Sequence, residues 1–292
     1  MTGEEPQASP RAQQPQQPQQ PQQPEDVDWH CHSPWSDGQG TLAGLARRAR
    51  AEGARLGISD HALGDNRRLR TPEQLAAYRQ DVRRHGLYAG VEISVGDLEW
   101  DVDLDAFDYV IASLHTVRLP EVTVSAVRYL NWRAGIYPAY APSLTLASRE
   151  AYFDAWLGAL EATVRRWPVT ILGHFTLLPE HAAASGRFVL GEDPRPDERA
   201  RAWLDETIML CLRHGIAIEL NSKSRVPDPG FVRRALDLGA SFSLGSDAHQ
   251  VRRAGDLSYG RELLRRLQIP ARRVLRAPRN VRDVDCAEPA AG

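Results

Sequence analysis

The sequence predicts an α/β protein built on one parallel β-sheet, and two regularities of the chain lead to this fold class. Short apolar segments with strand character are mostly separated by longer segments with helical character. Most of the helical segments end at a glycine or carry cations in their last turn, which is typical of helix C-termini. Strands that alternate with helices pair in parallel through right-handed crossovers.

Seven strands are expected, at residues 27–31, 55–59, 88–93, 109–113, 169–172, 216–220 and 241–245. Six helices are expected, at residues 41–52, 71–85, 148–167, 197–214, 231–238 and 259–267. The clearest helix start is Thr71-Pro72, because threonine caps a helix N-terminus and proline is tolerated in the first turn. No glycine-rich phosphate-binding loop follows the first strand, which disfavours a dinucleotide-binding sheet. The alternation fits both an open doubly wound sheet and a closed barrel.

The chain of 292 residues has room for one large α/β domain with a tail at each end. Residues 1–25 contain repeats of Gln-Gln-Pro and cannot bury enough apolar surface to fold, so we expect a disordered tail. Residues 26–280 are expected to form the folded domain, and residues 281–292 a C-terminal tail.

The composition excludes several classes of protein. A net charge of −2 gives no overall basic field, which disfavours nucleic acid as a partner. No apolar run reaches 18 residues, so no membrane association is expected. Three cysteines without paired spacing, together with an N-terminus that lacks an apolar signal core, favour the cytoplasm.

Histidines and carboxylates gather where the predicted strands end. Six of the nine histidines lie at strand ends: His30, His32, His61, His115, His174 and His249. Asp37, Glu92 and Asp247 lie beside them in the same segments. Because parallel strands of a barrel end at the same face, these nine side chains are expected to converge. Nine nitrogen and oxygen ligands exceed the need of one tetrahedral zinc and suit two or three ions, with a carboxylate such as Glu92 as a bridge.

The order of these motifs resembles that of the polymerase and histidinol phosphatase (PHP) superfamily. The matching segments are Asp28-Trp29-His30-Cys31-His32, Ser36-Asp37-Gly38, Asp60-His61, Gly90-Val91-Glu92, Ser113-Leu114-His115, Gly173-His174 and Ser246-Asp247-Ala248-His249. The resemblance covers about residues 26–280. It implies a distorted, TIM-like (β/α)7 barrel whose nine ligands hold two to three divalent ions (Zn, Mn or Fe) at the C-terminal strand ends.

Within the superfamily, the segments at residues 58–62, 109–115, 173–175 and 214–222 resemble histidinol phosphatases most. That resemblance implies a metal-dependent phosphomonoester hydrolase that acts on a small phosphorylated metabolite, with histidinol phosphate of histidine biosynthesis as the candidate substrate. Arg225 matches, after one gap, the arginine that holds the substrate phosphate, and Lys223 is the chain's single lysine in the same loop. Arg225, Asp247 and His249 are the expected catalytic residues, the last two by placing water or protonating the leaving group.

One feature departs from that family. Histidinol phosphatases carry a second arginine shortly after the Gly-His-Phe segment, whereas residues 175–180 contain no cation and Arg187 is a more distant substitute. The departure weakens the case for histidinol phosphate itself and leaves phosphate-ester hydrolysis intact. Two long loops, at residues 118–147 and 179–196, are expected over the same end of the barrel, and loops of such length are usually functional or disordered.

Two other functions stay open at this point. One is a PHP-type nuclease or nucleotide phosphoesterase, which the slightly negative charge disfavours. The other is a non-catalytic, metal-bound scaffold that binds partners through its Gln/Pro-rich tail.

Overall fold

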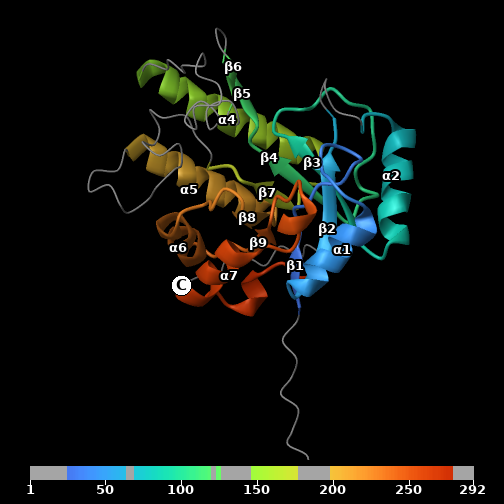
Figure 1. Ribbon diagram of the computed structural model, residues 1–292. Coiled ribbons are helices and arrows are strands. Elements are labelled where there is room, and N and C mark those ends of the chain that lie inside the picture. Colours follow the sequence, from blue (N-terminus) through green and yellow to red (C-terminus); the bar gives the residue numbers. More distant parts are fainter. Residues whose placement is uncertain (1–24, 64–68, 120–122, 126–145, 177–197, 279–292) are drawn as a thin grey trace, which may run out of the picture.

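A computed structural model describes residues 25–63, 69–119, 123–125, 146–176 and 198–278 (Figure 1). Seven parallel strands close into a barrel, and its last strand pairs with its first through Leu244 and Asp28. The barrel strands are β1 (Asp26–Asp28), β2 (Ala54–His61), β3 (Tyr88–Ser94), β4 (Tyr109–Ser113), β7 (Ile171–Gly173), β8 (Ala217–Asn221) and β9 (Phe242–Gly245). Closure decides between the open sheet and the barrel, and it confirms the predicted fold class.

Helices surround the barrel on its outer side (Figure 1). They are α1 (Leu42–Ala51), α2 (Pro72–Arg84), α4 (Leu146–Arg166), α5 (Glu198–Arg213), α6 (Pro229–Asp237) and α7 (Ser258–Arg266), with 3-10 turns η1 (Val251–Arg253) and η2 (Ala271–Arg273). Thr71 caps α2 as predicted, and Gln74 completes a reciprocal capping box. No helix among the described residues is long and apolar enough to cross a membrane.

Several element bounds differ from the sequence-based expectation, and three of the differences concern β1, α4 and the segment after β4. β1 ends at Asp28 rather than at residue 31, because the Asp28 carboxylate accepts the backbone N–H groups of His30 and Ser246 where a regular ladder would continue. α4 begins at Leu146, two residues before the expected start. The predicted loop at 118–147 contains part of an antiparallel hairpin, formed by β5 (Thr116–Arg118) and β6 (Thr123–Ser125). Three-residue strands are too short to show a period in the sequence.

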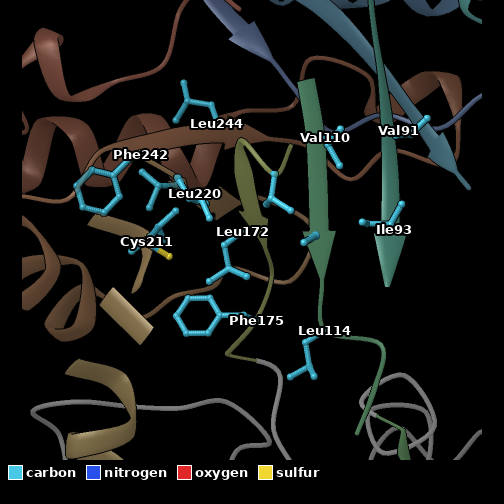
Figure 2. Close-up of a cluster of buried hydrophobic side chains, with 14 of the residues drawn as sticks. Val91, Ile93, Val110, Leu114, Leu172, Phe175, Cys211, Leu220, Phe242 and Leu244 are labelled. Carbon is cyan, nitrogen blue, oxygen red and sulfur yellow. The ribbon is translucent and has the colours of Figure 1, made fainter. Parts of the chain in front are cut away.

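Two apolar layers fill the protein. The larger layer lies between the strands and the helices, and Figure 2 shows part of it, with side chains of β3, β4, β7, β8 and β9 beside Cys211 of α5. A smaller cluster joins residues near the N-terminal ends of several barrel strands: Val27, Trp29, Tyr109, Ile111, Ile171, Ala217 and Leu275. The Trp29 ring lies edge-on against Tyr109, with ring centroids 4.9 Å apart. This apolar cluster closes one end of the barrel, so the polar side chains gather at the other end.

Candidate metal centre

The buried carboxylate of Glu92, on β3, lies at the centre of the site. Five imidazole rings surround it: those of His30, His32, His61, His115 and His174. Three ring nitrogens lie 3.2 to 3.3 Å from Oε1 of Glu92, and the two others lie 2.7 and 3.6 Å from Oε2. The rings come from segments far apart in sequence, which the barrel brings to one point.

Asp37 and Asp247 extend the cluster on either side of His32. Oxygen atoms of Asp37 lie 3.5 Å from Nε2 of His61 and 3.4 Å from Nε2 of His249. Asp247 Oδ1 lies 3.6 Å from Nε2 of His32 and 3.4 Å from Nδ1 of His249. Asp37 is 49% exposed, whereas His32 is fully buried, so the cluster runs from the barrel interior to the surface. All nine side chains named from the sequence therefore lie together.

The loop after β1 takes its shape from Asp60, a residue that the sequence reasoning left without a role. The Asp60 carboxylate accepts the backbone N–H groups of Ser33 and Ser36 at 2.8 and 3.2 Å, and the hydroxyls of both serines. Burial raises the pKa of Asp60 to about 6, and these hydrogen bonds oppose that shift. The loop so held carries Asp37, next after Ser36, to the edge of the cluster.

Burial and neighbouring charges set the protonation of the donors. Burial, helped by the nearby ring of His61, lowers the pKa of His32 to about 3. Burial also lowers the pKa of His115, to about 4. Burial on its own would raise the pKa of Glu92, but the surrounding imidazoles outweigh it and hold that pKa well below the ordinary value. Neutral ring nitrogens and ionised carboxylates are the forms that bind divalent metals.

Unpaired polar atoms inside the cluster fit a bound cation. Nε2 of His30, both ring nitrogens of His32 and Nδ1 of His174 are buried and have no hydrogen-bond partner among the described residues. Buried polar atoms rarely lack partners, and each such atom calls for an explanation. Donor atoms within 4.8 Å of one another form three groups: His32–Asp37–His61–His249, His30–His32–Glu92 and His61–Glu92–His115. These residues fit metal ions by donor type, spacing and lack of other partners.

Two residues of the cluster have backbones in the left-handed region, His174 with φ of 21° and Asp247 with φ of 49°. Such conformations are uncommon outside glycine and gather at functional sites. The surrounding structure holds these two side chains in place at a cost in backbone energy.

The two cations predicted to hold phosphate differ in position. Lys223 Nζ lies 3.0 Å from Oδ1 of Asp247 and 3.3 Å from Nδ1 of His249, at the edge of the cluster. Arg225 points elsewhere: its Nη2 donates to Oε2 of Glu262 at 3.1 Å, and its guanidinium covers the ring of Tyr259 at 4.7 Å. The structure thus brings Lys223 to the cluster and does not bring Arg225.

A tight turn explains the position of Arg225. Asn221 Oδ1 accepts the backbone N–H of Ser224 at 2.9 Å, and the backbones of Asn221 and Val226 exchange hydrogen bonds. Arg225, with φ of 52°, is turned toward α7 by this closure. The role of Arg225 in holding phosphate stays a prediction, and in this structure its side chain is paired with Glu262 instead of the cluster. Arg187 and most of the two long loops lie outside the described residues.

Sequence reasoning also missed Glu219, a buried carboxylate of β8 that contacts the His30 ring. A signal for it exists, because residues two apart on a strand share a face. Ala217 belongs to the apolar cluster inside the barrel, so Glu219 faces the interior as well. By contrast, Cys31 packs in the outer apolar layer as a small hydrophobic residue, as predicted.

A parallel (β/α) barrel with a dense histidine and carboxylate cluster at its strand ends defines the class of this protein. The family model described as "PHP domain" matches residues 28–223, and the chain belongs to that family. One similar solved structure, from Bifidobacterium adolescentis, carries a provisional description as a metal-dependent phosphoesterase. It is 17% identical, with a TM-score of 0.30, over 83% of this chain and 96% of that chain. None of the curated proteins compared with the chain matches it significantly.

Proposed function

We propose that this protein is a metal-dependent phosphomonoester hydrolase. The observation that carries the proposal is the cluster of nine nitrogen- and oxygen-donating side chains, Glu92 among them, several of which have buried atoms without a hydrogen-bond partner among the described residues. Closely spaced divalent ions suit phosphate-ester chemistry, because they stabilise both the attacking and the leaving oxygen. Membership of the PHP family supports the same reaction class.

The nine donors would hold two to three ions of Zn, Mn or Fe. Glu92 belongs to two of the three donor groups, which supports it as a carboxylate that neighbouring ions would share. When bound, such ions supply Lewis acidity toward a phosphoryl oxygen and lower the pKa of a water molecule.

The chain's own residues account for substrate binding and proton transfer. The Lys223 ammonium, at the rim beside Asp247, supplies a point charge for a phosphate oxygen. His249 is partly exposed at the same rim, where its ring can hand a proton to the leaving alkoxide. Asp247 fixes both groups, since its Oδ1 contacts the lysine at 3.0 Å and the His249 ring at 3.4 Å.

The proposed substrate class is a small phosphorylated metabolite, with histidinol phosphate as the specific candidate. Support for that candidate comes from the segments that resemble histidinol phosphatases, at residues 109–115 and 214–222 above all. We also propose a cytoplasmic location, because the described cysteines, Cys31 and Cys211, are buried free thiols.

A substrate comparison tests the proposal. The purified full chain, reconstituted with Zn²⁺ or Mn²⁺, should hydrolyse p-nitrophenyl phosphate and histidinol phosphate. A phosphodiester and a short oligonucleotide serve as controls and should be cleaved far more slowly. Faster cleavage of the oligonucleotide than of the phosphomonoesters would indicate a nuclease instead of a phosphatase. The lack of turnover on every substrate would indicate a non-catalytic metal-binding protein.

A further inference from the structure

We propose that Glu219 is a positioning residue, which holds the His30 ring with Nδ1 protonated and Nε2 directed at Glu92. The inference deepens the proposed function and rests on it in one respect, namely that His30 is a metal ligand. Nothing in the motif set of the sequence assigns a role to Glu219.

Glu219 and His30 contact each other directly through their side chains. Oε1 of Glu219 lies 2.7 Å from Nδ1 of His30, and both side chains are buried. An ionised carboxylate only accepts hydrogen bonds, so the proton of this contact belongs to Nδ1 of the ring. The opposite nitrogen, Nε2, lies 3.3 Å from Oε1 of Glu92 and has no hydrogen-bond partner among the described residues. A metal-binding histidine commonly has this arrangement, in which a carboxylate fixes the tautomer and the ring orientation.

The other oxygen of Glu219 accepts a hydrogen bond from a second member of the cluster, His174. Oε2 accepts the backbone N–H of His174 at 2.8 Å, at the residue whose φ of 21° is unusual. The rings of His30 and His174 stack with centroids 5.6 Å apart. One carboxylate therefore fixes the side chain of His30 and the main chain of His174 together.

Gly245, on the adjacent strand β9, leaves the space that the Glu219 carboxylate occupies. A Cβ atom at this position would lie only 2.1 Å from Oε1 of Glu219 and 2.9 Å from Cβ of His30. Gly245 pairs with Asn221 of β8, and the Asn221 amide donates to Oε1 of Glu219 at 3.2 Å. The strand pairing thus seats Glu219 against the His30 ring only if residue 245 lacks a side chain.

A purely structural role for a buried carboxylate is the competing explanation, and Asp28 provides the matched control. The Asp28 carboxylate is also fully buried and accepts backbone N–H groups from His30, Ser246 and Gly255, but it makes no hydrogen bond to an imidazole ring of the described residues. Replacing Asp28 therefore disturbs the same region without removing the partner of a ring nitrogen.

The test compares Glu219→Gln with Asp28→Asn in the full chain by calorimetric titration with Zn²⁺ after removal of metal. Glutamine keeps the size of the side chain but has one acceptor oxygen, so it cannot accept from both Nδ1 of His30 and the His174 N–H. We expect Glu219→Gln to weaken Zn²⁺ binding by about 10- to 100-fold, and Asp28→Asn to lower thermal stability without a comparable loss of affinity. Equal Zn²⁺ affinity in Glu219→Gln and the wild type would overturn the inference.

A second readout is independent of metal binding. In ¹⁵N-histidine-labelled protein, the wild type should show a slowly exchanging proton on Nδ1 of His30, shifted or lost in Glu219→Gln and retained in Asp28→Asn. An unprotonated Nδ1 on the His30 ring of the wild type would contradict the inference. If the wild type fails to bind Zn²⁺, the proposed function is refuted, and this proton signal still decides whether Glu219 orients His30.

Discussion

The Lys223→Met substitution tests which cation of the loop after β8 receives the substrate phosphate. Methionine keeps most of the length of the lysine side chain and removes the ammonium group, with its charge and its hydrogen-bond donors. Lys223 Nζ lies 3.0 Å from Asp247, whereas the guanidinium of Arg225 is paired with Glu262 on α7. Arg225→Met is therefore a matched control, because it removes a positive charge two residues away that points elsewhere.

The size of the effect follows from the exposure of Lys223. A hydrogen bond to a charged group contributes about 1.5 to 3 kcal/mol. The Lys223 side chain is 47% exposed, so solvent screening places the loss near the lower limit. A loss of about 1.5 kcal/mol corresponds to roughly a tenfold change in an equilibrium constant.

Steady-state kinetics on p-nitrophenyl phosphate, with metal content measured on the same samples, gives the readout. Lys223→Met should raise KM about tenfold at unchanged metal content, and Arg225→Met should leave KM close to the wild-type value. A larger rise in KM for Arg225→Met than for Lys223→Met would contradict the role of Lys223 and show that Arg225 binds the substrate phosphate.

Three further predictions concern the centre of the site, the barrel interior and the buried thiol. Glu92→Gln removes the charge shared by two donor groups, so metal content measured by plasma mass spectrometry should fall by at least one ion per chain; full retention would contradict the bridging role. Gly90→Ala would place a Cβ 2.2 Å from the Tyr109 ring and should lower the free energy of unfolding by about 1 to 3 kcal/mol in a denaturant titration. Gly158→Ala serves as its control: at this exposed helical position an added Cβ would meet no atom of the described residues within 4 Å beyond the helix's own backbone, so the substitution should stabilise the fold slightly. Burial raises the pKa of Cys211 to about 12, so this thiol stays protonated at pH 8.5. In a thiol titration, Cys211→Ser should therefore leave the number of reactive thiols of the folded protein unchanged. In denaturant, the same substitution should lower the number of reactive thiols by one.

The sequence predicts the strand-end cluster well because the topology does most of the positioning. Once strands are parallel, every strand end faces the same way, so His61, Glu92 and Asp247 join one cluster although they lie far apart in the chain. The strand boundaries matter little for this conclusion: β1 ends before His30, yet the ring still reaches the cluster.

The sequence does not predict contacts that depend on tertiary partners. Arg225 follows a loop motif that favours phosphate binding, but its direction is decided by Glu262 and Tyr259 of α7, which no local pattern links to it. Glu219 occupies an inward-facing position of β8, but its contact with His30 needs the closed barrel, in which β9 lies between β8 and β1 and both side chains point inward. Closure of the barrel likewise depends on the pairing of β9 with β1, the two ends of the domain.

Removal and return of metal tests whether the cluster around Glu92 is catalytic. The full chain is treated with EDTA, and its phosphomonoesterase activity is followed while Zn²⁺ or Mn²⁺ is added back. We expect activity to be lost on chelation and to return in step with two to three ions bound per chain. Activity that survives complete removal of metal, or metal that binds without restoring turnover, would contradict the proposal that the cluster around Glu92 is the catalytic centre of a metal-dependent phosphatase.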